Sequence, residues 1–541
     1  RGGVAVALDG ADERSLATTD VADRLVGGFP RAYQDFATLD SVTLQEEYGV
    51  WIKRRFLRGI IPCMGELHLY NTLTRKEEPF VPRTPGKVSM YACGLTPQSP
   101  AHVGHMRGVV VLDVVRRWLE HLGYTVEFVQ NFTDIDDKII RRAQEEGISI
   151  REVAEKYSQM YIEDALALGV RLPRFVKVTE NMQDIIEMVQ KLVEAGYAYV
   201  VDGDVYFEVS RFPEYGKLSG RTVEELKAGA RIEVDERKCH PEDFALWKSA
   251  KPGEPAWESP WGAGRPGWHI ECSALSLKYL QPAFDIHAGG MDLIFPHHEN
   301  EIAQSEAYLN CQQPFARYWL HWGPVRLRQE KMSKSTGVVV PIRELRQQYE
   351  PAVIRFFLLT VHYRTPLEFS YGRLEEAKAG LERIRTAVQR AEAFLRTQSA
   401  PPDADERLAE PYRVPFTEAM NNDFNTAQAI AVVFEVVRVI NHRLNTPDLV
   451  GRVETAQEVH GLLNALRWMM ETVLGVTLQA SMSGQSQRFE QLMQAVLAWR
   501  AELRSRKLYD LADRIRDDLK AMGILLEDSP QGTTWRLTEN D

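Results

Sequence analysis

The most constraining feature of this chain is a strand, a polar loop, a helix and a second strand in immediate succession. Residues 87–92 carry a strand pattern, and a loop rich in glycine, proline and serine follows them. Residues 102–122 have apolar side chains at helical spacing and end before Gly123, a common helix stop. Residues 126–130 return to a strand pattern. This order predicts a β-α-β unit and therefore a parallel sheet.

Composition is that of an ordinary globular protein. The chain has 541 residues, 44% of them hydrophobic and 26% charged, and its richest apolar stretch, residues 108–115, is interrupted by Asp113. A bilayer-spanning helix needs about 20 consecutive apolar residues, so we expect no membrane span. The five widely spaced cysteines do not suggest a disulfide framework, which fits a reducing cytoplasm. The net charge of −11 disfavours a coat of nucleic acid but allows a local basic groove.

The first 63 residues differ from the rest of the chain. They begin with Arg1 and show neither a long apolar segment nor a clean helical repeat. A strongly patterned region opens at Met64, and a natural start there would explain both observations. We therefore expect residues 1–63 to be disordered or the product of read-through. A genuine accessory extension is the alternative.

The remainder of the chain predicts an interrupted sheet followed by helices. Residues 151–261 have helical segments, a strand pattern and a run rich in proline, tryptophan and glycine, so they read as an insertion. The sheet pattern resumes at residues 284–290 and continues to about His321. After Pro341 the chain is mostly helical, and its tail predicts one helix over residues 489–522 and a short β-like segment.

Two short motifs have the residue types of a phosphate site. His102, Gly104 and His105 lie at a loop-to-helix junction, where a helix N-terminus offers free N–H groups to an anion. Further along, Lys331 and Lys334 alternate with hydroxyl side chains and could close on a triphosphate. Each motif alone is weak, because surface histidines or a solvated basic loop would explain it. In this order and at this separation, the two resemble the signatures of class I aminoacyl-tRNA synthetases.

A third group of residues could bind a metal ion. Cys93 ends the first strand, Cys272 lies in a later segment, and His297 and Glu301 are four residues apart on one face of an expected helix. Two thiolates, an imidazole and a carboxylate make a plausible tetrahedral zinc shell. The competing interpretation is that both cysteines are small core residues and that the neighbouring polar residues only begin a helix.

Four longer segments, residues 90–107, 131–138, 261–273 and 295–304, resemble the cysteinyl-tRNA synthetase family. The resemblance extends from Leu67 to the C-terminus. It implies an α/β fold: a Rossmann-type parallel-sheet catalytic domain with an inserted connective domain, followed by a helical anticodon-binding region and a small C-terminal α/β-like tail. The expected boundaries are 64–150 and 262–325 for the two catalytic halves, 151–261 for the insertion, 326–400 for the lysine loop and stem-contact region, 401–487 for the helical tRNA-binding domain and 488–541 for anticodon recognition.

The resemblance also implies an activity, which is the ligation of L-cysteine to tRNA(Cys) with ATP and Mg²⁺. One Zn²⁺ per chain would be held by Cys93, Cys272, His297 and Glu301, with the substrate thiolate bound to the metal. Such a bond gives selectivity that shape cannot, since a pocket separates near-isosteres by only ~10 to 200-fold. The remaining implied roles are catalytic for His102, His105, Lys331 and Lys334, cofactor-binding for Gly104, Gly289, Gly290, Asp292 and Lys334, and substrate-binding for Thr96, Trp268 and His287.

The chain departs from the family pattern at one place near the expected pocket. Thr96 is followed by Pro97, Gln98 and Ser99, where the family usually has Val-Tyr-Asp, so an aromatic and an acidic residue are missing. Thr96 itself is kept, which leaves the amino-acid assignment standing. We expect a cytoplasmic monomer.

Two alternatives to tRNA ligation follow from the same residues. A related ligase that joins cysteine to an amino-sugar shares the metal residues and both signatures but lacks the long helical tail. A non-catalytic paralogue that binds tRNA is the other alternative. The tail after Pro341 disfavours the first, and the intact histidines, lysines and metal candidates disfavour the second.

Overall fold

The computed structural model describes most of the chain after Met64. The described residues are 65–221, 237–327, 340–398, 404, 406–446, 453–479, 482–529 and 532–537. Residues 1–63, Lys331 and Lys334 therefore lie outside the described part. Among the described helices, none combines the length and the apolar character that a bilayer crossing requires.

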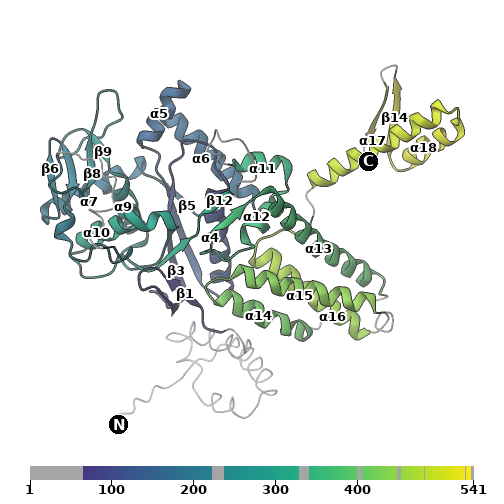
Figure 1. The fold of residues 1–541 in the computed structure, drawn as a ribbon, viewed down its shortest axis with the longest axis horizontal. Coiled ribbons are helices and arrows are strands. Elements are labelled where there is room, and N and C mark those ends of the chain that lie inside the picture. The colour runs from purple at the N-terminus through teal and green to yellow at the C-terminus, as the bar shows by residue number, and fades with distance from the viewer. Residues whose placement is uncertain are drawn as a thin grey trace, which may run out of the picture. The chain divides into compact units, whose positions relative to one another are not determined.

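A five-stranded parallel sheet, ordered β11-β10-β3-β4-β5, carries the first half of the architecture (Figure 1). Every neighbouring pair of strands in this sheet is parallel. Its strands are β3 (Lys87–Leu95), β4 (Thr125–Phe132), β5 (Arg174–Lys177), β10 (Phe284–Gly290) and β11 (Ala316–Trp322). Helix α4 (Val103–His121) connects β3 to β4, so the predicted β-α-β unit is confirmed.

The strand order reverses between β3 and β10. From β3 the chain moves outward to β4 and β5, and it later returns to place β10 and β11 on the other side of β3. In open α/β sheets such a switch point leaves a crevice at the carboxyl ends of the central strands, where ligands bind. Cys93 lies near the end of β3, and Gly289 and Gly290 end β10. The topology thus brings a predicted metal ligand, Cys93, and two residues predicted to bind the nucleotide, Gly289 and Gly290, to the same edge of the sheet.

Helices flank the sheet, and local sequence explains where they begin and end. Helix α6 begins with a capping box in which Ser149 and Glu152 satisfy each other's main-chain N–H groups. Helix α5 ends at Gly147, whose φ of 67° suits a residue without a side chain. These helices are α5 (Asp137–Glu146), α6 (Ile150–Ala167), α7 (Met182–Glu194), α9 (Trp268–Leu280) and α10 (Glu299–Tyr308).

A second sheet, entirely antiparallel, is inserted between β5 and α9. Its order is β6-β7-β8-β9, with bounds β6 (Ala198–Val201), β7 (Asp204–Phe207), β8 (Phe244–Ser249) and β9 (Gly264–Pro266). The rings of Phe207 and Phe244 stack across neighbouring strands at 5.0 Å. Because β5 belongs to the parallel sheet, the separate sheet starts at Ala198, later in the chain than residue 151.

Two short strand pairs lie beside the parallel sheet, and a buried arginine supports one of them. The pairs are β1 (His68–Asn71) with β2 (Lys76–Pro79), and β12 (Val325–Leu327) with β13 (Leu367–Phe369). Arg107 on α4 is fully buried, and burial lowers its pKa to about 10. Its guanidinium donates to five main-chain carbonyls that lie before β12 and β13, those of Gly323, Pro324, His362, Tyr363 and Thr365.

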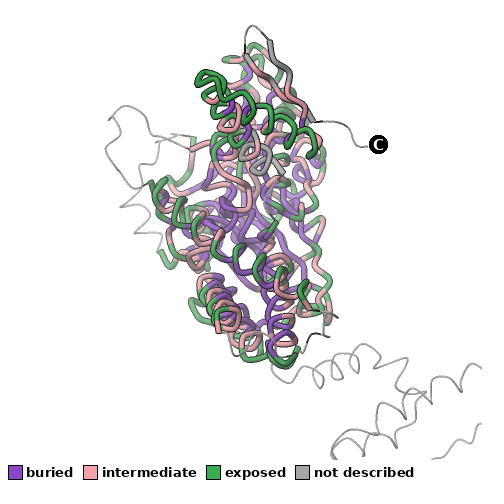
Figure 2. Tube along the Cα trace, turned by 90° about the vertical axis from the view of Figure 1, so that its right-hand side faces the viewer, coloured by how far each residue is buried: buried purple, intermediate pink, exposed green. Residues whose placement is uncertain are grey.

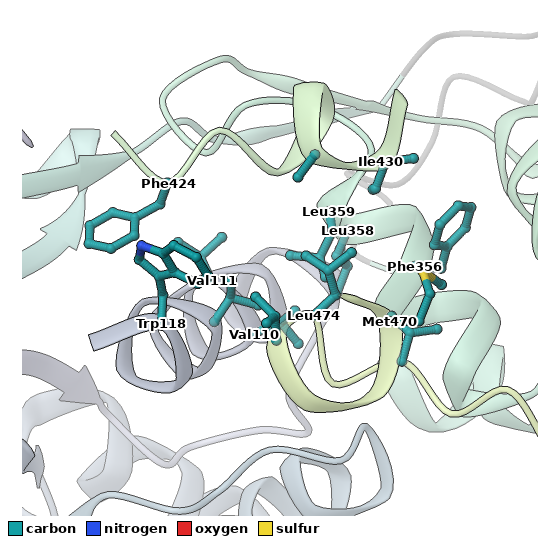
Figure 3. Packing of buried hydrophobic residues seen from close by; sticks show 14 of the residues in the cluster. Val110, Val111, Trp118, Phe356, Leu358, Leu359, Phe424, Ile430, Met470 and Leu474 are labelled. Carbon is teal, nitrogen blue, oxygen red and sulfur yellow. The ribbon is translucent and has the colours of Figure 1, made fainter. Parts of the chain in front are cut away.

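The described part of the chain after residue 340 is mostly helical, as predicted. Its helices are α11 (Ile342–Gln348), α12 (Pro351–Leu359), α13 (Tyr371–Arg396), α14 (Glu410–Asn421), α15 (Thr426–Asn445) and α16 (Val453–Arg467), followed by a π-helical turn (Trp468–Val473). Val110 and Val111 of α4, Leu358 of α12 and Met470 of the turn belong to one buried cluster (Figure 3). The helical region therefore shares its core with the parallel sheet.

A buried ion cluster reinforces this shared core. Asp113 on α4 accepts hydrogen bonds from Arg355 on α12, from Arg117 Nε at 2.7 Å and from the main-chain N–H of Arg171 at 2.9 Å. Arg355 also donates to the carbonyls of Leu168 and Leu474. Burial raises the pKa of Asp113, but Arg355 and Arg117 outweigh it, so the pKa lies below its usual range.

The C-terminal region contains two helices where one was expected, so that prediction was wrong. They are α17 (Met482–Ser505) and α18 (Tyr509–Ala521), and the hairpin β14 (Ile524–Ser529) and β15 (Gly532–Leu537) follows. Lys507 adopts a left-handed φ of 60°, and the N–H of Leu508 bonds the carbonyl of Leu503 to close α17. Glycine usually occupies such a position, so the lysine gave no stop signal. Exposed residues predominate on these helices (Figure 2), and in α18 only Ala512 and Leu519 are buried among the described side chains.

Candidate active site and metal centre

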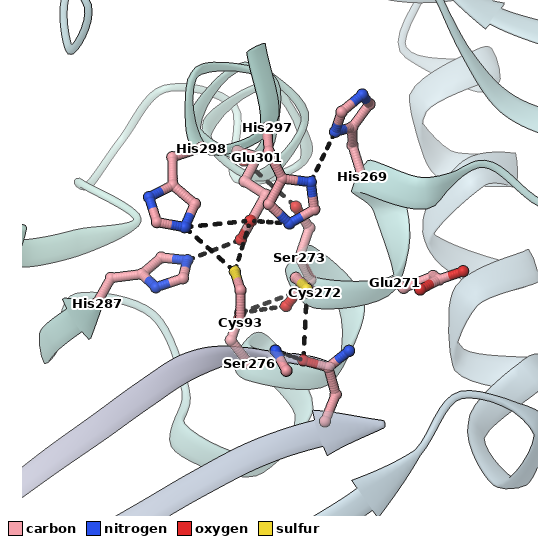
Figure 4. A network of polar contacts seen from close by, with 12 residues as sticks. Cys93, His269, Glu271, Cys272, Ser273, Ser276, His287, His297, His298 and Glu301 are labelled. Atoms are coloured by element: carbon pink, nitrogen blue, oxygen red, sulfur yellow. Dashed lines mark hydrogen bonds and ion pairs between the residues drawn. The ribbon is translucent and has the colours of Figure 1, made fainter. Parts of the chain in front are cut away.

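The four residues predicted to bind metal converge at the switch point of the sheet (Figure 4). Cys93 comes from β3, Cys272 from α9, His297 from a π-helical turn (Ile294–His298) and Glu301 from α10. One potential ligand atom from each lies within 4.8 Å of the others, and all four side chains are buried. The predicted spacing of His297 and Glu301 is realised, with Nε2 and Oε1 2.9 Å apart.

The ionisable groups of this cluster shift one another's pKa in opposite directions, and burial holds the pKa of Cys93 well above its usual range. Burial would raise the pKa of Cys272, but hydrogen bonding with Cys93 and His297 lowers it to about 6. Burial would lower the pKa of His297, but Glu301 and Cys272 raise it to about 10. The pKa of Glu301 lies well below its usual range, because His287 and His297 outweigh the effect of burial. Two sulfurs, an imidazole and a carboxylate are donors of the kind that bind a zinc ion.

A second set of potential ligands overlaps the first. Cys93 and Glu301 also lie with His287 and His298 in a group whose ligand atoms are within 4.8 Å of one another. His287 Nε2 is 2.7 Å from Glu301 Oε2, and His298 Nε2 is 3.2 Å from Cys93 Sγ. Both histidines therefore lie within hydrogen-bonding distance of residues of the first set.

Of the three residues expected to line the amino-acid pocket, Trp268 and His287 contact the cluster. Trp268, the first residue of α9, is 44% exposed, and its ring stacks on His297 at 4.4 Å. His287 on β10 is completely buried and contacts Glu301. Thr96 is half-buried and directly follows the last residue of β3. Trp268 therefore offers an accessible apolar face beside the potential metal ligands.

The first signature motif caps helix α4. The ring of His102 accepts the main-chain N–H of Gly104 at 3.1 Å, and His105 Nδ1 accepts the N–H of His102 at 3.4 Å. The two rings stack at 3.6 Å, and a Cβ on Gly104 would come within 2.9 Å of the His102 ring. Burial lowers the pKa of both histidines, that of His105 to about 3 with the help of His102. Both imidazoles are therefore neutral at physiological pH.

The other predicted nucleotide-binding residues lie at the end of β10. A Cβ on Gly289 would meet the ring of His298 at 2.4 Å, and one on Gly290 would meet Asp292 Oδ1 at 2.4 Å. Asp292 is exposed in the short turn that follows the strand. Glycine at both positions lets His298 and Asp292 pack closely against the carboxyl end of β10.

Sequence reasoning missed several polar residues around the cluster. Buried Thr133 donates to Glu271 Oε2 at 2.8 Å, and burial raises the pKa of Glu271 well above its usual range. Asn131 Oδ1 accepts the N–H of Gly94 at 2.8 Å, beside Cys93. Thr133 and Asn131 belong to a segment that carried the family resemblance, which was the available signal for them.

The fold and the two motifs together define a class I aminoacyl-tRNA synthetase. The family model of the tRNA synthetases class I (C) catalytic domain matches residues 79–379, and that of the DALR domain matches residues 415–479. The fold is also that of a methionyl-tRNA synthetase from Mycobacterium tuberculosis, with a TM-score of 0.56 and 14% identity over 72% of this chain and 92% of that one.

Similar sequences identify the family within this class. A cysteine–tRNA ligase of Carboxydothermus hydrogenoformans is 52% identical over 472 residues, covering 87% of this chain and 100% of the relative. One from Thermococcus onnurineus is 50% identical over 480 residues, covering 87% of this chain and 99% of the relative. The chain belongs to the cysteine–tRNA ligase family.

Proposed function

We propose that the chain activates L-cysteine with ATP and transfers it to the 3′-terminal adenosine of tRNA(Cys). The observation that carries the proposal is the convergence of Cys93, Cys272, His297 and Glu301 at the switch point of a class I sheet. Family membership supports the overall reaction, and the DALR domain supports tRNA rather than an amino-sugar as the acceptor.

The first step requires no protein nucleophile. The carboxylate of cysteine attacks the α-phosphorus of ATP, which carries Mg²⁺, and pyrophosphate leaves, so the protein contributes positioning and charge stabilisation. His102 and His105 at the N-terminus of α4 are proposed to orient the nucleotide with their neutral imidazoles. From the sequence, Lys331 and Lys334 are proposed to neutralise charge on the leaving pyrophosphate.

Selectivity for cysteine is proposed to come from the floor of the pocket. A zinc ion held by Cys93, Cys272, His297 and Glu301 would supply a Lewis acid with high affinity for a thiolate. Serine and alanine lack this donor, whereas a pocket relying on shape alone would separate them from cysteine by only ~10 to 200-fold. The half-exposed ring of Trp268 beside His297 is proposed to cover the bound side chain and exclude water.

Amino-acid-dependent exchange of pyrophosphate into ATP tests this proposal. Cysteine should support exchange and serine and alanine should not, and cysteine should then be charged onto tRNA(Cys). Cys272→Ser should release zinc and raise the Michaelis constant for cysteine at least about tenfold, because a site that has lost one ligand binds metal weakly. Cys311→Ser is the matched control, since Cys311 is exposed.

Two results would contradict parts of the proposal. Zinc content by atomic spectroscopy and kinetics that are both unchanged in Cys272→Ser would exclude Cys272 as a ligand. Cysteine-dependent exchange without charging of tRNA would point to an amino-sugar acceptor instead.

A further inference from the structure

We infer that His298, held in place by His321, is a positioning residue that supports Cys93 as a metal ligand. The inference rests on the metal site of the proposed function. Neither His298 nor His321 belongs to the four-ligand set, yet both are buried at its edge, with exposed fractions of 0% and 2%. Their side-chain contacts form a continuous series of hydrogen bonds that starts at the sulfur of Cys93.

This series consists of three contacts of hydrogen-bond length. His298 Nε2 lies 3.2 Å from Cys93 Sγ, and His298 Nδ1 lies 2.8 Å from His321 Nε2. His321 Nδ1 then lies 2.8 Å from the hydroxyl of Thr72, which is half-buried. Both nitrogens of both rings are therefore used, so neither imidazole can rotate without breaking two contacts.

Metal binding fixes the direction of these hydrogen bonds. A metal-bound cysteine is a thiolate and carries no hydrogen, so it can only accept. His298 must then donate from Nε2 to the sulfur of Cys93, which leaves its Nδ1 to accept from His321 Nε2. His321 Nδ1 in turn accepts from the hydroxyl of Thr72. Each link holds one hydrogen, and one neutral tautomer of each histidine satisfies every acceptor.

The sheet provides the space and the rigidity for this series of hydrogen bonds. In the parallel pairing of β10 and β11, His321 lies in register with Gly289. A side chain at position 289 would meet the ring of His298 at 2.4 Å, so a glycine there admits the ring. The imidazole of His298 is thus held between the end of one strand and a side chain of the next, and the N–H donor to Cys93 is preorganised.

The charge of the site gives this donor a function. Two thiolates and one carboxylate exceed the charge of a zinc ion by one negative unit, and a substrate thiolate would add another. In a buried site an N–H aimed at sulfur offsets part of that excess, and such supporting contacts raise metal affinity. The same logic explains the overlapping ligand set, because Glu301 directs Oε1 towards Cys93 and His297 and receives His287 at Oε2. His287 and His298 are then supporting donors.

Three variants of the full chain test the inference. His298→Phe keeps a ring but removes the N–H, His298→Gln restores an N–H near the position of Nε2, and His321→Phe removes the anchor. His442→Phe is the control, since His442 is exposed on α15. The zinc dissociation constant is measured by chelator competition, and the absorption of the cobalt-substituted protein reports cysteine ligation. Thermal unfolding of each metal-free variant reports packing.

We expect His298→Phe to weaken zinc binding about 10 to 100-fold, as for other supporting contacts of metal ligands. The thiolate-to-cobalt band should change, His298→Gln should recover most of the affinity, and His321→Phe should fall between them. Wild-type affinity and an unchanged cobalt spectrum in His298→Phe and His321→Phe would overturn the inference. Equal losses in the Phe and Gln variants with lowered melting temperatures would also overturn it, because packing would explain them. A wild-type chain without zinc affinity would instead refute the metal site itself.

Discussion

Replacing Asp113 by asparagine tests how much the buried ion cluster contributes to stability. The substitution keeps the shape of the side chain and the oxygen that accepts the N–H of Arg171. It removes the negative charge that faces Arg355 and Arg117, whose side chains are 1% and 10% exposed. Arg355 would then be a buried cation whose remaining partners are the carbonyls of Leu168 and Leu474.

The expected loss is large because the pair is desolvated. Removing one partner of a buried ion pair typically costs about 3–5 kcal/mol, whereas an exposed pair contributes about 1 kcal/mol or less. Since the urea dependence of a chain of this size is about 3 kcal/mol per molar or more, the unfolding midpoint should fall by roughly 0.5–1.5 M. Unfolding is followed by tryptophan fluorescence. Asp184→Asn is the matched control, because Asp184 pairs with Lys278 at 2.7 Å on the surface.

The effect of Asp113→Asn should also depend on pH. Since the pKa of Asp113 in the folded protein lies below its usual range, its stabilisation is fully present above the unfolded pKa, about 3.9. The stabilisation is lost as the pH falls through the folded pKa. The difference between wild type and Asp113→Asn should therefore narrow below about pH 4. A midpoint shift no larger than that of Asp184→Asn, or a difference that does not change with pH, would refute the reasoning.

Three further predictions concern the site and the tail. Gly289→Ala should displace the ring of His298 and weaken zinc binding, as chelator competition would show, and a cost of about 1–3 kcal/mol from overpacking should appear in thermal unfolding. Burial and His102 lower the pKa of His105 to about 3. His105 should therefore contribute no inflection near pH 6.5 to the pH profile of pyrophosphate exchange, and the profile of His105→Asn should have the same shape as that of the wild type there. Deleting residues 482–541 should leave pyrophosphate exchange intact and raise the Michaelis constant for tRNA, and equal damage to both half-reactions would contradict this.

Local sequence signals predicted the parallel sheet well. Strand and helix patterns around Gly123 gave the β-α-β unit, since each element carries its own period and its own stop residue. The break after α17 was missed, because Lys507 adopts a left-handed conformation that sequence normally marks with glycine. The strand β5 could not be assigned to the main sheet, since four residues with little burial carry almost no pattern.

In the site, too, the contacts between residues near in sequence could be predicted and those between distant residues could not. His297 and Glu301 could be paired from their spacing of four residues, although His297 lies in the turn before α10, and the cysteines from residue type and family resemblance. His298 and His321 could not be linked, because their contact depends on the register of β11 against β10 and on the absence of a side chain at Gly289. Register between distant strands is a property of the folded sheet.

The carbonyl partners of Arg107 have a consequence for how the sequence around them can change. All five acceptors are main-chain oxygens, so any residue that keeps the backbone path, at Pro324 or Thr365 for example, preserves the contact. The arginine has no such freedom. A lysine has three N–H donors on one atom and could not reach two separate loops at once, although it carries the same charge. Among related chains, the residues that supply these five carbonyls should therefore vary, whereas the arginine should not be replaced.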